Sequence, residues 1–167
     1  MRVGAGEGAP TRHGEPAGAL LAALLGVELA AGVVHGLFSL YWGAGGSWLL
    51  PTIGRQMLEA FGEDRWLLVP VGLVKVGCAA APVLLARHGL LARGPWRAIC
   101  WLGATVLVVW GGLGATSALL VLGGVVRTAE GYDREGMIGH AYLWDPLFLL
   151  WGLSLAASLV LVRRRRA

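Results

Sequence analysis

The sequence predicts an all-α integral membrane protein, a four-helix bundle with a short amphipathic helix in the first outer connection. Of the 167 residues, 56% are hydrophobic and 14% are charged, which is far from the balance of an ordinary soluble domain. The hydrophobic residues gather into four segments, and each can supply the about 20 residues of helix that cross a bilayer core. Basic residues concentrate in alternate connections, as they do in multi-pass membrane proteins.

The chain divides into an N-terminal segment, a membrane domain and a short tail. Residues 1–16 are rich in glycine, proline and charge, so we expect a disordered cytoplasmic N-terminus. The membrane domain covers residues 17–162, with spans at about 17–42, 66–86, 98–126 and 141–162. The first span is longer than the apolar part of a signal peptide, and no convincing cleavage site follows it. We therefore expect it to be retained as a helix.

The connection between the first two spans contains a helix signal of its own. Pro51 lies near the start of this segment and Gly62 follows its end, the positions that these residues favour at helix termini. Four large apolar side chains fall on one side of it: Ile53, Met57, Leu58 and Phe61. The pattern predicts a small amphipathic helix that lies on the outer membrane face.

The charges of the connections predict the orientation of the chain. Residues 87–97 carry three arginines, one histidine and no acid, whereas residues 43–65 and 127–140 each carry two arginines and three acids. The positive-inside rule therefore places both termini and the middle connection in the cytoplasm. We expect the protein to lie in the cell (plasma) membrane. Tryptophans at the two boundaries match an aromatic belt: Trp42, Trp48 and Trp66 outside, and Trp96 and Trp101 inside.

The basic tail, residues 163–167, indicates that the protein contacts membrane lipids. The net charge of +4 could suggest a nucleic-acid-binding protein, but four arginines directly follow an apolar segment. Clusters in that position bind anionic lipid headgroups, so we expect lipid contacts from Arg163, Arg164, Arg165 and Arg166. We expect no nucleic acid as a partner. A homo-oligomer or a membrane protein partner stays open.

Lys75 is the one lysine of the chain and lies inside the second span. Because an ammonium at membrane depth is costly, such residues usually face a protein interior or a wet cavity. From the rise of a helix, Lys75 lies roughly 13 Å below the outer boundary, His35 roughly 10 Å and Glu28 roughly 21 Å. The lysine side chain could therefore reach either residue. Small residues share these faces: Ala31, Gly32 and Ser39 beside Glu28 and His35, and Gly72, Ala79 and Pro82 beside Lys75.

Two interpretations of this polar cluster remain open. Glu28 and Lys75 could be a buried pair that fixes helix register, or part of a functional site such as a vestibule or a proton path. Arg127 and Asp145, near the outer ends of the third and fourth spans, could form a second pair. His35 could ligate haem or a metal, but no second histidine lies at its depth, so we expect no metal and no cofactor.

Catalytic motifs are absent from the sequence. There is no phosphate-binding loop, no zinc-protease motif and no nucleophile elbow, so we assign no catalytic residue and favour a non-catalytic protein. The glycine-rich residues 110–114 (WGGLG) lie mid-membrane, where helix packing explains them better than phosphate binding.

Two stretches resemble a known family. Residues 35–46 read HGLFSLYWGAGG and residues 140–152 read HAYLWDPLFLLWG. They resemble an uncharacterised family of small bacterial membrane proteins, domain of unknown function family 3995, and the resemblance extends over most of the chain. Its most specific residues are Tyr41, Trp42, Gly43, Gly45, Gly46, Asp145, Pro146 and Leu147, and Arg127 at the end of the third span also fits. The resemblance implies four spans and a shared outer motif. This chain departs from the family in having His140 where many members carry an acid.

Three classes of function remain. The favoured one is a small multi-pass membrane protein with a structural or partner-binding role. The second is a small transporter or proton-coupled component in which Glu28, His35 and Lys75 line a wet pathway. The third is a lipid- or isoprenoid-modifying enzyme that uses Glu28 or His35 as an acid–base group.

Overall fold

A computed structural model describes residues 15–127 and 131–164, and helices joined by turns make up this part of the chain, with no strand in it. Most of the predicted disordered N-terminus and the last three residues of the basic tail lie outside the described residues. The elements in chain order are α1 Glu15–Gly43, η1 Leu50–Ile53, α2 Arg55–Phe61, η2 Arg65–Leu67, α3 Leu68–Arg87, α4 Gly94–Leu122, α5 Arg134–Gly139, the π-helix η3 His140–Trp144, and α6 Asp145–Arg164.

Four helical segments are long and apolar enough to cross a membrane, which confirms the predicted fold class. They are Gly18–Gly43, Arg65–Arg87, Gly94–Leu122 and Arg134–Arg163. The third begins and ends earlier than predicted. It begins at Gly94 because Pro95 occupies the first turn, and it ends at Leu122 because Gly124 turns the chain with a positive φ of 70°.

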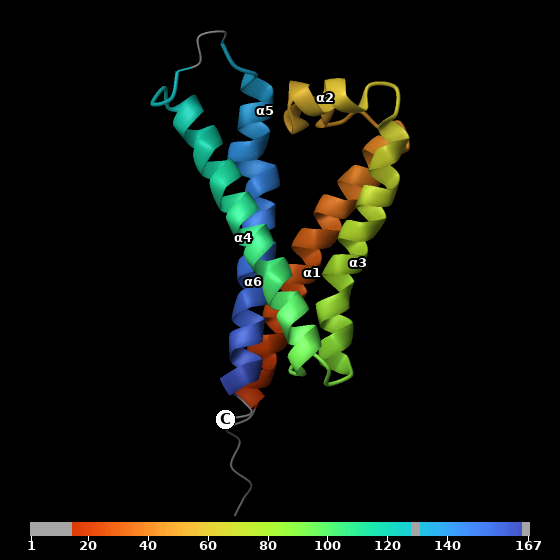
Figure 1. The fold of residues 1–167 in the computed structure, drawn as a ribbon, viewed down its shortest axis with the longest axis vertical. Helices are drawn as coiled ribbons and strands as arrows, with labels where there is room; N and C mark the ends of the chain where they lie inside the picture. Colours follow the sequence, from red (N-terminus) through yellow and green to blue (C-terminus); the bar gives the residue numbers. More distant parts are fainter. Residues whose placement is uncertain (1–14, 128–130, 165–167) are drawn as a thin grey trace, which may run out of the picture.

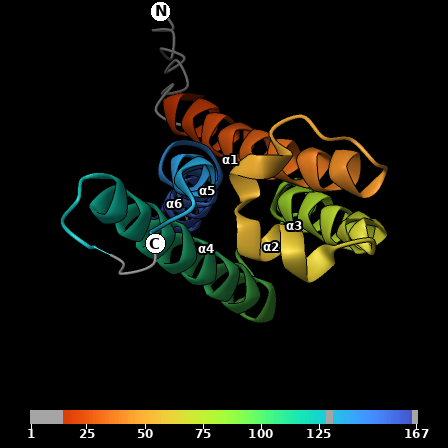
Figure 2. The same cartoon turned by 90° about the horizontal axis from the view of Figure 1, so that it is seen from above.

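The four long helices form two pairs that diverge toward one end. α3 packs along α1, α4 packs along α6, and α1 crosses α6 to join the pairs. Figure 1 shows the pairs spreading apart toward the end where α2 lies across them, and Figure 2 shows α6 between α1 and α4. We call this the α2 end. The first turn of α1 and the last turn of α6 lie at the opposite, terminal end (Figure 1).

Glycines permit the close approach within each pair. A Cβ atom on Gly36 of α1 would lie 3.0 Å from the carbonyl oxygen of Gly72 in α3. In the other pair, a Cβ atom on Gly152 of α6 would lie 2.9 Å from the backbone nitrogen of Val108 in α4. Since real Cβ atoms rarely come so close to a backbone, these positions accept only glycine at the observed spacing.

The first connection folds as two short pieces where we predicted one helix. Gly54, with a φ of 96°, separates η1 from α2. Ile53, Leu58 and Phe61 pack beneath these pieces on a cluster formed by Trp42, Leu50, Leu68 and Trp144, whereas Met57 is exposed. Trp42 is 3% exposed and belongs to this core, while Trp48 and Trp66 are largely exposed.

Candidate functional site

Of the two partners that its depth allows, Lys75 contacts His35 and not Glu28, and it also contacts Ser39. The Lys75 Nζ atom lies 3.2 Å from the His35 Nδ1 atom and donates to the Ser39 Oγ atom at 3.0 Å. His35 and Ser39 are both buried, on the face of α1 that meets α3. Lys75 also lies over the Phe148 ring of α6, 5.6 Å from its centroid. These contacts join three helices at membrane depth.

Glu28 forms a separate link. It is completely buried, and the Trp151 indole of α6 donates a hydrogen bond of 3.3 Å to its Oε1 atom. Its second oxygen, Oε2, has no hydrogen-bond partner among the described residues, and the same is true of the His35 Nε2 atom. Glu28 therefore connects α1 to α6 through one bond and leaves one acceptor open.

A tightly packed layer separates Glu28 from His35. Gly32 lies between them on α1, and a Cβ atom there would lie 2.5 Å from the Ala79 Cβ atom and 2.8 Å from the Trp151 Cε2 atom. Ala79 and Trp151 are almost completely buried in the same apolar cluster. Close apolar packing at Gly32 therefore lies between the polar side chains of Glu28 and His35.

An aromatic layer covers His35 on the side of the α2 end. The His35 ring lies against the Phe148 ring at a tilt of 32°, with 4.0 Å between centroids, and approaches the Trp144 ring at 5.6 Å. Trp144 in turn meets Trp42 edge to face at 5.0 Å, and Phe38 at 5.1 Å. These rings close the interior of the bundle above the lysine.

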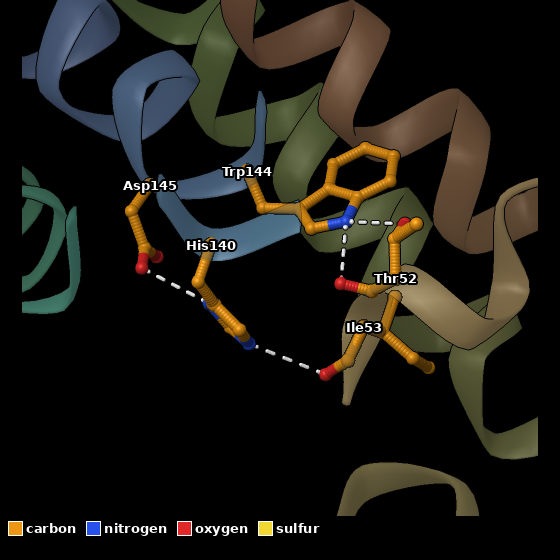
Figure 3. A network of polar contacts seen from close by, with 5 residues as sticks. All are labelled: Thr52, Ile53, His140, Trp144 and Asp145. Carbon is orange, nitrogen blue, oxygen red and sulfur yellow. Dashed lines mark hydrogen bonds and ion pairs between the residues drawn. The ribbon is translucent and has the colours of Figure 1, made fainter. Parts of the chain in front are cut away.

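A second polar network lies at the α2 end, where η3 meets η1 (Figure 3). The His140 Nδ1 atom lies 3.0 Å from the Asp145 Oδ2 atom, and the His140 Nε2 atom lies 3.3 Å from the Ile53 carbonyl oxygen. Both neighbours are acceptors, and a neutral imidazole has only one N–H to donate. The two contacts together therefore favour a protonated His140 that is paired with a carboxylate.

The pair of Asp145 with Arg127, which the sequence left open, is not formed. Asp145 is 2% exposed and bonded to His140, whereas Arg127 is exposed in the connection that follows α4. The side chain of Asp145 fills the space left by Gly114 of α4, where a Cβ atom would collide with Oδ2. The carboxylate is thus held between α6 and α4, out of reach of the loop arginine.

Trp144 fixes the first connection to the same network. Its indole nitrogen donates to the Thr52 carbonyl oxygen at 3.2 Å and to the Thr52 Oγ1 atom at 3.0 Å (Figure 3). Gly139 makes room for this contact, because a Cβ atom there would collide with Thr52. The network therefore ties η1 to the fourth membrane segment.

The network borders a recess of about 750 Å³ at the α2 end. Residues from η1 and α2, from the connection before α5 and from η3 line it, among them Ile53, Arg55, Glu59, Tyr132 and His140. π-Helical turns such as η3 occur frequently at functional sites. Together, the π-turn, the buried carboxylate and the recess make this corner a candidate binding site.

Asp133 lines the recess and links α2 to α5 by hydrogen bonds. Its carboxylate accepts hydrogen bonds from the backbone N–H of Arg55 at 2.6 Å and of Gly136 at 3.1 Å. Burial by itself raises the pKa of Asp133, but these two N–H donors and the charge of Arg55 outweigh it and lower the pKa below its ordinary value. Asp133 thereby caps α5 and holds α2 beside it.

Four residues of the predicted outer motif, Tyr41, Trp42, Gly45 and Gly46, gather where α1 ends. Trp42 donates to the Trp48 carbonyl oxygen at 2.9 Å, and the Tyr41 hydroxyl accepts from the Trp48 N–H at 3.3 Å. Gly45 has a φ of 100°, and Gly46 packs on the Tyr41 ring. Pro146 follows Asp145 in the first turn of α6. Sequence reasoning missed Trp151 and Thr52, because neither the indole of Trp151 nor the carbonyl oxygen of Thr52 belongs to a residue pattern that predicts a polar contact.

The fold and these contacts define a helical membrane protein with two levels of linked polar side chains in its interior. The chain belongs to the family described as proteins of unknown function (DUF3995), whose model matches residues 32–155. The matched segment contains His35, Lys75, His140 and Asp145, while Glu28 precedes it. No curated protein and no solved structure matches the chain.

Proposed function

We propose that this chain is a small multi-pass protein of the plasma membrane with a structural, partner-binding role. Both termini lie in the cytoplasm, where the arginines from Arg163 onward bind anionic headgroups, and the α2 end faces outside. In this role the bundle is a rigid scaffold that presents the recess at the α2 end to a partner, either a second copy or another membrane protein.

The observation that carries the proposal is the placement of the polar contacts. Lys75 bonds across the α1–α3 interface, Trp151 across the α1–α6 interface, and Trp144 across the contact between η1 and η3. Polar bonds between helices in a membrane fix their register and stabilise their association. The packed layer at Gly32 also interrupts any polar route between Glu28 and His35. This arrangement supports a scaffold better than a pathway.

The orientation can be tested with single cysteines placed in a background that lacks Cys78 and Cys100. Gln56 is exposed on α2 and His88 is exposed at the end of α3, on opposite ends of the bundle. We expect a membrane-impermeant maleimide to label Gln56→Cys in intact cells, and to label His88→Cys only after lysis. The reverse pattern would place the termini outside and refute the proposed topology.

Replacing Lys75 by methionine is expected to lower the free energy of unfolding by about 1 kcal/mol in chloride buffer, because His35 and Ser39 lose their shared donor. Unfolding in sodium dodecyl sulfate measures this effect. Val74→Met is the matched control, since Val74 is the adjacent residue of α3 and is 64% exposed. If Lys75 were a functional cation kept at a cost to stability, methionine would raise the stability instead.

A proton-coupled role is the second candidate, and the open polar atoms favour it. Within residues 15–127 and 131–164, Glu28 Oε2 and His35 Nε2 are buried without partners, and ionisable groups at membrane depth often mark proton paths. Proteoliposomes separate the two candidates. A scaffold gives no proton flux under a pH gradient, whereas a pH-dependent flux that is lost in Glu28→Gln would establish the second candidate and exclude a purely structural role.

A further inference from the structure

A groove of about 430 Å³ runs between α1 and α3 at the terminal end of the bundle. On α1 it extends from Gly18 to Leu29, and Val83, Ala86 and Arg87 of α3 form the other wall. From the rise of a helix, the α1 wall is roughly 16 Å long. The groove therefore leads from the terminal end into the bilayer interior, with apolar walls and one charged residue.

Gly26 shows that the groove is open space between two helices that pack closely elsewhere. A Cβ atom on Gly26 would meet nothing within 4 Å, whereas Cβ atoms on Gly32 and Gly36 of the same helix would collide with α3. Gly26 and Ala22 are exposed, so the groove opens to the surroundings of the bundle. Water would find few polar partners on such walls. A hydrocarbon chain from the bilayer fits them better.

Arg87 supplies a positive charge at the end of the groove. It is the last residue of α3 and is exposed, and no acidic side chain pairs with it among the residues that the structure describes. The next connection adds Arg93 and Arg97 and contains no acid, while Glu15 begins α1 at the same end. Basic residues therefore outnumber acidic ones here. A guanidinium matches the geometry of a phosphate, to which it can donate two hydrogen bonds.

We propose that the groove between α1 and α3 binds one anionic phospholipid, with an acyl chain along its apolar walls and the phosphate on Arg87. The order of the two parts matches the lipid, because the charged residue lies at the membrane boundary and the apolar walls lead inward. Basic pockets between membrane helices bind anionic headgroups in this way. The site goes beyond the scaffold role, and it depends on neither the basic tail nor the orientation of the chain.

The test is the thermal stability of the purified full-length protein in neutral detergent, measured by tryptophan fluorescence as phosphatidylglycerol or phosphatidylcholine is added. We expect phosphatidylglycerol to raise Tm saturably by about 2–4 °C, at a concentration about tenfold lower than phosphatidylcholine requires. Arg87→Met should remove the difference between the two lipids. Arg93→Met is the matched control, since Arg93 is exposed and lies outside the groove, and it should retain the difference.

A second variant tests the acyl chain separately from the headgroup. The added side chain of Gly26→Phe would enter the groove, and nothing in the protein obstructs it within 4 Å of the Cβ position. We expect this variant to fold and to lose the saturable response to phosphatidylglycerol. Gly77→Phe is the control, because Gly77 is also an exposed helical glycine with open space at its Cβ position, and it lies outside the groove.

Four results would overturn the proposal. They are an equal rise of Tm with both lipids, a preference for phosphatidylglycerol that survives in Arg87→Met, equal responses in Gly26→Phe and Gly77→Phe, and a rise that inorganic phosphate alone reproduces. Replacing the four tail arginines, residues 163–166, by glutamine should leave the response unchanged. If that variant loses the response while Arg87→Met keeps it, the lipid binds at the tail, which overturns the groove site and supports the lipid contacts of the proposed function.

Discussion

Replacing Gly111 by leucine is expected to lower the free energy of unfolding by about 3 kcal/mol, or to prevent the bundle from assembling. Gly111 lies where α4 crosses α6. A Cβ atom there would lie 2.6 Å from the Asp145 carbonyl oxygen and 2.7 Å from the Leu149 backbone nitrogen. Both atoms belong to a helix backbone, so neither can move alone. The helices must separate and lose contacts along their length.

Gly103 provides the matched control for this prediction. It lies in the same helix, and a Cβ atom there would meet nothing within 4 Å. Gly103→Leu should therefore leave the unfolding transition in sodium dodecyl sulfate unchanged or raise it slightly, because leucine has the better helix propensity. Equal losses in the two variants would show that glycine at position 111 is not required for packing.

The sequence predicts that the glycines of residues 110–114 serve helix packing, and the structure refines this residue by residue. Gly111 and Gly114 face α6, where a side chain would collide with Asp145. Gly112 faces only a distant Leu149 side chain, 4.0 Å from its Cβ position. The rotation of α4 about its axis decides which glycine is buried. Because α4 carries no charge inside the bilayer, nothing in the sequence fixes that rotation.

The four membrane segments could be predicted because the bilayer imposes their length and composition. The polar partners could not. Helix rise placed Lys75 between His35 and Glu28 in depth, so either could have bonded to it. The outcome depends on how α1 and α3 rotate and cross, which the glycines Gly36 and Gly72 determine through contacts that depth does not describe.

The pair of His140 with Asp145 was hidden from the sequence for a geometric reason. In a regular α-helix, residues five positions apart point about 140° away from each other. The π-helical turn His140–Trp144 contains extra residues per turn and brings the two side chains to one side. No residue pattern in the sequence indicates this π-helical turn. The sequence therefore suggests the charged Arg127 as the partner of Asp145 instead.

Asp145→Ala is expected to lower the free energy of unfolding by about 3 kcal/mol, because it leaves the His140 imidazolium beside only a carbonyl acceptor. The value is at the low end for a broken buried pair, since the His140 side chain is 34% exposed and water can solvate it in part. The loss should also loosen η1, because His140 would lose the carboxylate that positions its ring against the Ile53 carbonyl oxygen. Hydrogen exchange in residues 50–61 measures that release.

A double-mutant cycle separates the pair from the packing around it. If the pair carries the effect, His140→Ala in the Asp145→Ala background should cost at least 1 kcal/mol less than in the wild type, because the histidine has already lost its partner. Glu59→Ala is the control, since Glu59 is exposed on α2 beside the same recess. Additive losses in the cycle would contradict the pair, and would assign the effect to the cavity that opens against Gly114.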